Sequence, residues 1–391
     1  MTQTSEVFKT SEVFLKLTWM AVVLLMLLAA CAPPSATPTA LPPLTRVVSV
    51  STHTPTPPPP SATPTDTATP THTPTVTPVP PTPTATVPAV ARFMAVGDLM
   101  LARTIGERTL VQGAAWPFAG VAETFSQADI LVGNLECVIG DQGDPVRKSY
   151  TFQAPPVMAE ALGLAGFDVV SLANNHSLDY GVEGLADMLP RLRAAQVETA
   201  GAGADEVTAR APVIVRHNGV RVAVLAYVDV PVEGRSGFDT QSWSAGPVTP
   251  GLAWAHIDQM TDDIRAARTL SDIVVVMLHF GLEGRPQVTD DQEELARAAV
   301  DAGAGLVIGA HAHVLQRVEA YNEGLIVYNL GNFVFDGFAQ PSNYSAIFTA
   351  TLTPAGIREW GFVPVMVDKG VPRPATSEEA AVITARLSGG D

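Results

Sequence analysis

The sequence predicts an α/β fold for the residues from about Ala91 onward, and three observations support this. Short apolar runs rich in β-branched residues recur along this part of the chain. Segments with helical periodicity lie between several of these runs, and strand–helix alternation is typical of layered α/β domains. Of the 33 prolines, 18 lie between Pro33 and Pro88, so the earlier part is excluded from the core. The roughly 300 residues that remain suffice for one large domain.

The first 31 residues have the pattern of an export signal. Lys9 and Lys16 precede an apolar run from Leu17 to Ala30, which at about 14 residues is short of the roughly 20 that a membrane-spanning helix needs. Cys31 follows two alanines, and this ending resembles the lipobox of bacterial lipoproteins, in which the cysteine is lipidated. We expect a signal peptide over 1–31 and a lipid anchor on Cys31 at the extracytoplasmic face of the cell membrane. An uncleaved signal anchor is the alternative.

Residues 32–90 are predicted to be a spacer, because they are mostly Pro, Thr, Ala and Ser. Proline removes backbone donors and fixes φ, and this stretch has too few large apolar residues to form a core. We expect it to link the membrane to a folded domain over 91–370, with 371–391 as a C-terminal tail.

The folded part is predicted to alternate strands with helices, since short and nearly continuous apolar runs suit strands buried on both faces. The predicted strands are Arg92–Gly97, Ile130–Gly133, Val169–Ala173, Val213–Arg216, Val220–Val228, Ile273–His279, Leu306–Gly309 and Leu325–Leu330. The predicted helices are Pro156–Leu164, Leu185–Ala195, His256–Ala267 and Gln292–Ala302. No helical segment separates the last three apolar runs, which predicts antiparallel strands that close the sheet: Leu325–Asn332, Ser345–Leu352 and Glu359–Val367.

Charge and cysteine content exclude two classes of protein. The formal net charge is −16 and the pI is near 4.8, which argues against nucleic acid as a partner because phosphates need clustered Lys and Arg. An anionic substrate is still allowed, since a bound cation reverses the local sign of the field. With only two cysteines there is no disulfide framework, and Cys137 is expected to be a small buried residue.

Unusual polar residues fall where predicted strands end, which is where open α/β sheets bind ligands. Four of the six histidines outside the linker lie in these clusters. Imidazole and carboxylate side chains together suit Zn, Mn or Fe, and a shared carboxylate lets two cations lie close together. The candidate metal ligands are Asp98, Glu136, Asn175, His279, His311 and His313.

Six ordered segments carry a more specific resemblance. They are Ala95–Asp98, Gly133–Glu136, Ala173–Gly181, His279–Glu283, Ile308–His313 and Tyr328–Phe333. Together they resemble the CapA family of poly-γ-glutamate and capsule synthesis proteins, over about Phe93 to Val367. The resemblance implies a metallophosphoesterase-like (calcineurin-like) β-sandwich flanked by helices, in four layers α/β/β/α.

The resemblance also implies roles for individual residues. Asp98 and His313 would bind a first metal, and Glu136 would bridge it to a second. The second metal would be completed by Asn175, His279 and His311. His176 would act as the catalytic acid, and Asp179 would orient it.

The chain departs from the phosphoesterase pattern at Met100, where those enzymes usually have a histidine. A thioether is a poor ligand for a hard cation. The bridging aspartate is also replaced by the longer Glu136. We therefore expect one or two divalent ions (Mn, Zn or Fe), with the first position less well supplied than the second.

Four residues are candidates for contact with substrate, each with an ordinary alternative. Arg103 would clamp an anionic group, or lie solvated at a helix start. Lys148 and Tyr150 would approach the site, or belong to a surface turn. Glu283, four residues after His279, would contact substrate or support the ligand.

Three functions are consistent with these features. The first is a lipid-anchored, metal-dependent hydrolase or transferase in poly-γ-glutamate or capsule synthesis or export, acting on an anionic polymer or a phosphoester. The second is a non-catalytic surface lipoprotein that binds polymer or partners in a capsule-synthesis membrane complex, which Met100 favours. The third is a general surface phosphodiesterase.

Overall fold

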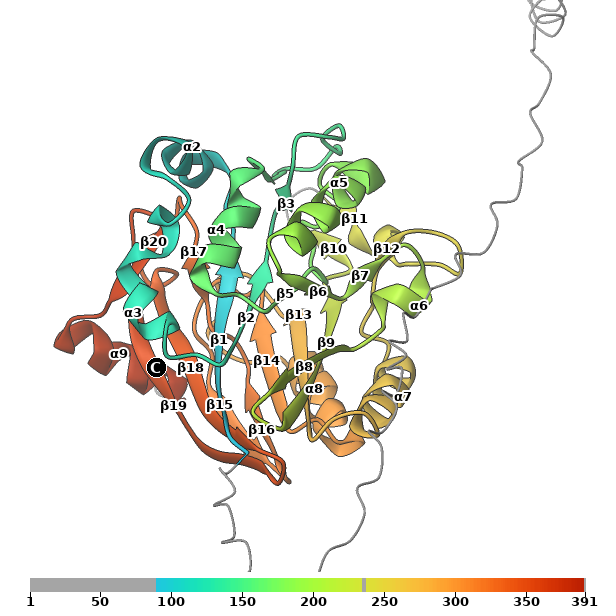
Figure 1. Ribbon diagram of the computed structural model, residues 1–391, viewed down its shortest axis with the longest axis vertical. Helices are drawn as coiled ribbons and strands as arrows, with labels where there is room; N and C mark the ends of the chain where they lie inside the picture. The colour runs from blue at the N-terminus through green and yellow to red at the C-terminus, as the bar shows by residue number, and fades with distance from the viewer. Residues whose placement is uncertain (1–88, 234–236, 390–391) are drawn as a thin grey trace, which may run out of the picture. The chain divides into compact units, whose positions relative to one another are not determined.

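The computed structural model describes residues 89–233 and 237–389, which form two β-sheets packed face to face with helices on both outer sides (Figure 1). The predicted layered α/β fold is therefore confirmed. The predicted signal peptide, Cys31 and all but the last two residues of the predicted linker lie outside the described residues. Among the described residues, no helix has the length and apolar character needed to cross a membrane.

The first sheet has β1 (Ala91–Leu99) at its centre, paired in parallel with β2 (Ile130–Leu135) and antiparallel with β18 (Tyr344–Thr353). β17 (Asn332–Val334) also pairs in parallel with β1, near the end of that strand. Parallel strands continue the sheet beyond β2, and antiparallel strands continue it beyond β18. The sheet is completed by β5 (Val169–Ser171), β6 (Glu198–Ala200), β19 (Gly356–Asp368) and β20 (Val371–Pro374).

The second sheet has four parallel strands with an antiparallel strand at each edge. The parallel strands are β9 (Val220–Asp229), β13 (Ile273–Phe280), β14 (Leu306–Ala310) and β16 (Gly324–Val327). The edges are β8 (Val213–His217) beside β9 and β15 (Val318–Tyr321) beside β16.

The core lies in two layers, which explains the continuous apolar runs of the second sheet. In β13, Val275 and Met277 pack into the cluster between the two sheets. The alternate side chains, among them Val274 and Val276, pack into a second cluster beneath α7 (Ile257–Arg268) and α8 (Asp290–Ala302). Because successive side chains of a strand point to opposite faces, a strand buried on both faces needs apolar residues at every position.

Helices cover the outer face of each sheet (Figure 1). α8 begins at a capping box, in which the Thr289 hydroxyl accepts from the Gln292 backbone, and it ends before Gly303 with a φ of 112°. Over the first sheet lie α2 (Arg103–Gln112), η1 (Trp116–Val121), α3 (Ala122–Phe125), α4 (Val157–Ala165) and α5 (Gly181–Ala194). The short elements are β3 (Val138–Ile139), β4 (Gln153–Ala154), β7 (Ala202–Gly203), α6 (Glu206–Ala209), β10 (Val232–Glu233), β11 (Phe238–Asp239), η2 (Thr240–Trp243) and β12 (Gly251–Leu252).

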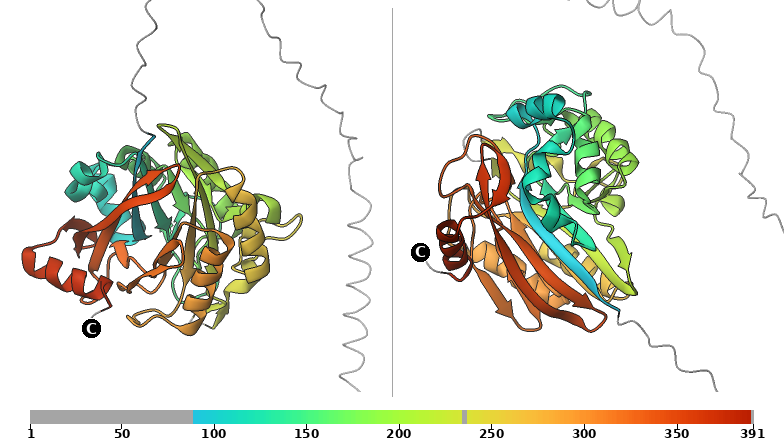
Figure 2. Two further views of the ribbon diagram at one scale, coloured as in Figure 1. Left: turned by 90° about the horizontal axis from the view of Figure 1, so that it is seen from below. Right: turned by 60° about the vertical axis from the view of Figure 1, so that its left-hand side comes forward.

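The end of the domain differs in part from the predicted run of antiparallel strands. β18 and β19 are antiparallel neighbours, as predicted. The prediction is wrong for β16, which pairs in parallel with β14, because β15 turns the chain back before β16 begins. Beyond residue 370, β20 pairs with β19, and α9 (Ser377–Leu387) packs on β18 and β19 (Figure 2).

Candidate metal centre

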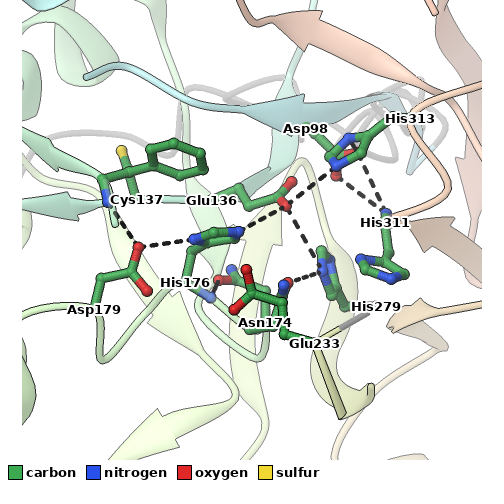
Figure 3. Close-up of polar contacts among 12 residues, drawn as sticks. Asp98, Glu136, Cys137, Asn174, His176, Asp179, Glu233, His279, His311 and His313 are labelled. Atoms are coloured by element: carbon green, nitrogen blue, oxygen red, sulfur yellow. Dashed lines mark hydrogen bonds and ion pairs between the residues drawn. The ribbon is translucent and has the colours of Figure 1, made fainter. Parts of the chain in front are cut away.

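The candidate ligands gather inside the domain, at the ends of parallel strands from both sheets. From the first sheet, Asp98 lies near the end of β1 and Glu136 directly follows β2. From the second sheet, His279 lies near the end of β13, and the turn after β14 carries His311 and His313. Figure 3 shows these five side chains converging on a common space. All of them are at least 95 % buried.

The turn after β14 holds its two histidines in an unusual backbone conformation. His311 has a φ of 89° and His313 a φ of 55°, a region that residues other than glycine rarely adopt. The backbone N–H of His311 lies 3.3 and 3.4 Å from the two carboxylate oxygens of Asp98, which ties the turn to the first sheet. The two imidazole centroids are 6.0 Å apart. The turn therefore directs two neighbouring histidines to two different positions.

Two groups of candidate ligands share one carboxylate. Glu136, His279 and His311 form one group, and Asp98, Glu136 and His313 form the other. Within each group the ligand atoms lie within 4.8 Å of one another. Glu136 thus lies between two positions that each have three candidate ligands.

The buried atoms of this centre fit a cation. Both carboxylate oxygens of Glu136 and Nδ1 of His311 are buried and have no hydrogen-bond partner within 89–233 or 237–389. Burial, together with the neighbouring Asp98, raises the pKa of Glu136 well above its usual range. Two adjacent buried carboxylates are costly without a counter-charge, so a divalent ion would offset this cost. Imidazole with carboxylate is a donor set suited to Zn, Mn or Fe.

The histidines differ in their tendency to take up a proton. Burial, followed by the neighbouring imidazoles, holds the pKa values of His279 and His311 well below the usual range. Burial is the largest single influence on His313 and opposes its protonation, but the hydrogen bond and charge of Asp98, together with Glu283 and Asn332, outweigh burial and raise the pKa of His313. Since metal ligation needs a neutral imidazole, His279 and His311 are already in the form that binds a metal.

Asparagine amides hold the ligands in place. The Asn134 side-chain nitrogen lies 2.9 Å from Asp98 Oδ1 and 3.1 Å from His279 Nδ1. The other ring nitrogen of His279 is 2.8 Å from Asn175 Oδ1, which places Asn175 beside the second group. Asn332 Oδ1 lies 2.9 Å from His313 Nδ1. These contacts fix the ring orientations before any cation binds.

His176 and Asp179 form a buried pair beside the centre. Nδ1–H of His176 donates to Asp179 Oδ2 at 2.7 Å, and Nε2 lies 4.0 Å from Glu136 Oε1. The imidazole stacks on Phe152 with centroids 4.3 Å apart. Burial lowers the pKa of His176, although the Asp179 charge opposes this shift. The pair therefore presents Nε2 to the space around Glu136.

The candidate substrate residues lie around the centre but are not equivalent. Arg103 Nη2 donates to Asp336 O at 2.9 Å and pairs with the Asp336 carboxylate, so it is not a free anion clamp. The Lys148 side chain is completely buried and lies 2.7 Å from an Asp179 oxygen, although the segment that carries it is mostly exposed. Tyr150 is half exposed.

Residues of the centre line two pockets. One, of about 290 Å³, is lined by His176 and His313 together with Arg103, Tyr150 and aromatic rings. The other, of about 570 Å³, is lined by His311 and by three carboxylates, and none of the described residues that line it is a Lys or Arg. Glu283 lines both pockets, which places it beside the centre, as considered from the sequence.

Some residues of the centre were missed or left undecided by the sequence analysis. Asn134 and Asn174 lie inside the quoted segments, two residues before Glu136 and one residue before Asn175, and this position was a usable signal. Glu233, which contacts Lys148 at 3.0 Å, lies in none of these segments and had no such signal. Met100 is completely buried and belongs to neither ligand group. Cys137 is buried as expected, and burial raises the pKa of its thiol to about 12.

Comparisons with known proteins agree with the resemblance of the six segments. The family model described as "Bacterial capsule synthesis protein PGA_cap" matches residues 92–337. "Capsule biosynthesis protein CapA" of Bacillus anthracis is 34% identical over 72% of this chain and 69% of that protein. "PGA biosynthesis protein CapA" of Bacillus subtilis (strain 168) is 32% identical over 72% of this chain and 73% of that protein. Among solved structures, a phosphatase from Mycoplasma pneumoniae aligns at 11% identity with a TM-score of 0.46, over 75% of this chain and 98% of that one.

Proposed function

Because the chain belongs to the PGA_cap family of bacterial capsule synthesis proteins, we propose that it takes part in making or exporting a capsule polymer such as poly-γ-glutamate. This membership confirms the resemblance predicted from the sequence. The matched residues, 92–337, include all six candidate metal ligands together with His176 and Asp179. The part of the chain that matches the family therefore contains the candidate metal centre.

We propose further that the chain is a metal-dependent hydrolase or transferase. The observation that carries this step is Glu136, whose two oxygens are buried without a hydrogen-bond partner between two groups of ligands. A bound divalent ion would polarise a carbonyl or phosphoryl oxygen and lower the pKa of a water molecule. The same ion would offset the acidic walls of the pockets for an anionic polymer or a phosphoester.

The residues of the chain supply the proton transfer in this proposal. Nε2 of His176 faces both Glu136 and the smaller pocket, so it is placed to give a proton to a leaving group there. Asp179 holds Nδ1 and would stabilise the positive charge on the imidazole whenever the ring carries the proton that it donates. Phe152, stacked on the imidazole, keeps water from one face of the ring.

Metal content and turnover together test this function. Protein purified without chelator should carry a divalent metal, and Asp98→Ala and His311→Ala should lose it. Turnover is measured on phosphodiester, phosphomonoester and γ-glutamyl substrates with added Mn, Zn or Mg. Metal-free protein, with both variants behaving like the wild type, would show that the centre is not a metal site.

A non-catalytic binding role is the second candidate, and Met100 favours it because a buried thioether stands where phosphoesterases usually have a histidine. In that case the protein would bind polymer or partner proteins of a capsule-synthesis membrane complex without turnover. Robust metal-dependent hydrolysis of any of the three substrate types would exclude a purely binding role. Hydrolysis combined with unchanged surface polymer in a deletion strain would favour a general surface phosphodiesterase instead.

We also propose that the protein is attached to the membrane through Cys31. The support is the sequence alone: an apolar run, two alanines and then the cysteine. Wild-type protein should take up radiolabelled palmitate and partition into detergent, whereas Cys31→Ser should do neither. Label on the Cys31→Ser variant would show that the lipid is attached to a residue other than Cys31.

A further inference from the structure

Lys148 has an unusual position for a residue of an exposed segment. Most residues from Asp141 to Tyr150 are exposed, yet the Lys148 side chain has no exposed surface. Its ammonium lies 2.7 Å from Asp179 Oδ1 and 3.0 Å from Glu233 Oε2. A buried lysine between two carboxylates is costly to desolvate and is retained where its position matters.

The ammonium is enclosed by protein groups, and its side chain has no surface exposed to a substrate. Nζ contacts one oxygen of Asp179, one of Glu233 and the backbone oxygen of Asn175. The ring of Trp243 lies 5.1 Å from Nζ on a further side. Lys148 is therefore enclosed by protein groups, which argues against the substrate-binding role considered for it.

The same ammonium fixes the carboxylate that holds His176. Asp179 Oδ2 accepts from the backbone N–H of Phe152 and from Nδ1 of His176, both at 2.7 Å. Its other oxygen faces Lys148, so both oxygens of the carboxylate are held. Nζ also lies only 3.3 Å from Nδ1 of His176. Without Lys148, the carboxylate would lose the contact that sets its rotation.

We propose that Lys148, anchored by Glu233, is a positioning residue that holds Asp179 in the rotation that orients His176. This inference rests on the role proposed for His176 as proton donor. In addition, the buried ammonium of Lys148 links β10, which carries Glu233, to the pair formed by His176 and Asp179. Three segments far apart in sequence, at Lys148, His176–Asp179 and Glu233, then act as one unit.

Four variants of the full chain test the proposal. Lys148→Met removes the ammonium, and Lys148→Arg keeps a cation at the same place. Lys148→Met combined with Glu233→Gln removes one charge of each sign, so it keeps the buried charge balance if Lys148→Met alone does not fold. Arg147→Met removes a cation from the exposed neighbour and serves as the matched control.

The first readout is the Nδ1–H signal of His176 in the NMR spectrum of histidine-labelled protein, assigned by its absence in His176→Gln. We expect this signal to be lost or shifted in both variants that lack the ammonium. It should be unchanged in Arg147→Met and largely kept in Lys148→Arg. This readout needs no substrate, so it decides the proposal even if the chain shows no turnover.

The second readout is kinetic and applies once a substrate is found. Loss of the ammonium should lower kcat on the order of tenfold to a hundredfold, with KM and metal content within about twofold of wild type. Lys148→Arg should recover part of kcat. An unchanged His176 signal in the charge-balanced double variant would overturn the proposal. A rise in KM with unchanged kcat would instead assign Lys148 to substrate binding.

Discussion

At the scale of single residues, the centre is defined by buried polar atoms that have no hydrogen-bond partner among the described residues. Glu136 is the clearest case, because this holds for both of its oxygens while Asp98 lies nearby. A group in this state destabilises the fold unless a cation is bound. The same residue therefore favours metal binding and opposes the stability of the metal-free protein.

We therefore expect Glu136→Gln to stabilise the metal-free protein and to weaken the stabilisation that added metal provides. In chelator, the neutral amide should raise the free energy of unfolding by about 1–3 kcal/mol, because a buried charge is removed. With metal added, the variant should show little of the stabilisation seen in the wild type. Thermal or urea unfolding in EDTA and in excess metal measures both effects. Equal destabilisation under the two conditions would mean that Glu136 is held by something other than a metal.

At the scale of elements, the close approach of β1 to the turn before β17 places Asp98. A Cβ atom at Gly97 would lie 1.9 Å from the backbone oxygen of Gly331, which also accepts from the Asp98 N–H at 3.0 Å. No side chain fits at this point without moving one backbone segment from the other. The glycine therefore sets the position of the first ligand.

Gly97→Ala should accordingly weaken both folding and metal binding. We expect a loss of about 1–3 kcal/mol in the free energy of unfolding, as for other overpacked sites, and a lower metal affinity. Gly361→Ala is the matched control, since its Cβ would meet nothing nearer than Thr349 Oγ1 at 3.8 Å. Calorimetric titration with metal and urea unfolding of both variants are the measurements. Equal metal affinity in the two would contradict the role given to Gly97.

The start of α9 gives a prediction that depends on pH. Thr376 and Glu379 form a capping box, and Arg373 contacts both oxygens of Glu379. The Arg373 hydrogen bond, followed by that from the Thr376 backbone, lowers the pKa of Glu379 to about 2. Because the folded pKa lies below the ordinary value of 4.5, the contribution to stability is complete above pH 4.5 and is lost as the pH falls toward 2.

Glu379→Gln should therefore lower the Tm at pH 7, and the difference from wild type should disappear by about pH 2. Thr376→Ala removes the cap itself and should cost about 1 kcal/mol at all these pH values. Tm values of the three proteins across this range give the comparison. A Glu379→Gln effect that stays constant down to pH 2 would show that the charge is not involved.

The regular elements were the most predictable part of the fold. Each of the eight strands and four helices predicted before the closing segment corresponds to an element of the structure. β15 was missed because Val318–Tyr321 alternates at an edge and is too short and polar to form an apolar run. Because β15 was missed, the direction of β16 was predicted wrongly. The extra strand turns the chain back once more, so β16 runs parallel to β14.

The residues of the site were predictable from the sequence, but their arrangement was not. The six candidate ligands could be proposed because they fall at strand ends, where parallel topology brings distant segments together. The division into two groups that share Glu136 depends on the backbone of the turn at His311 and His313, which no periodicity encodes. The burial of Lys148 between Asp179 and Glu233 also depends on tertiary packing, since its own segment is exposed.

At the scale of the whole molecule, the ligands join the two sheets. Asp98 and Glu136 come from the first sheet, and His279, His311 and His313 come from the second. A cation held by both groups would stabilise the packing of one sheet on the other. Metal binding and global stability should therefore be linked.

Chelation is expected to lower the stability of the wild-type protein as a whole. A ligand at about 100 times its Kd stabilises the folded state by about 2.7 kcal/mol, so Tm should rise with metal concentration and fall in EDTA. The Asp98→Ala variant should show smaller changes, because it removes a ligand from one of the two groups. Scanning calorimetry over a metal series measures this, and a wild-type Tm that is indifferent to metal would contradict the linkage.

The order of the ligands along the chain has a consequence for synthesis. One group needs His311 and the other needs His313, both close to the last fifth of the sequence, while Asp98 and Glu136 are made much earlier. A growing chain therefore carries both carboxylates before it carries His311 and His313, and it cannot complete either group. A cation would be bound only after these two histidines are made, from the metals present in the compartment where the final strands fold.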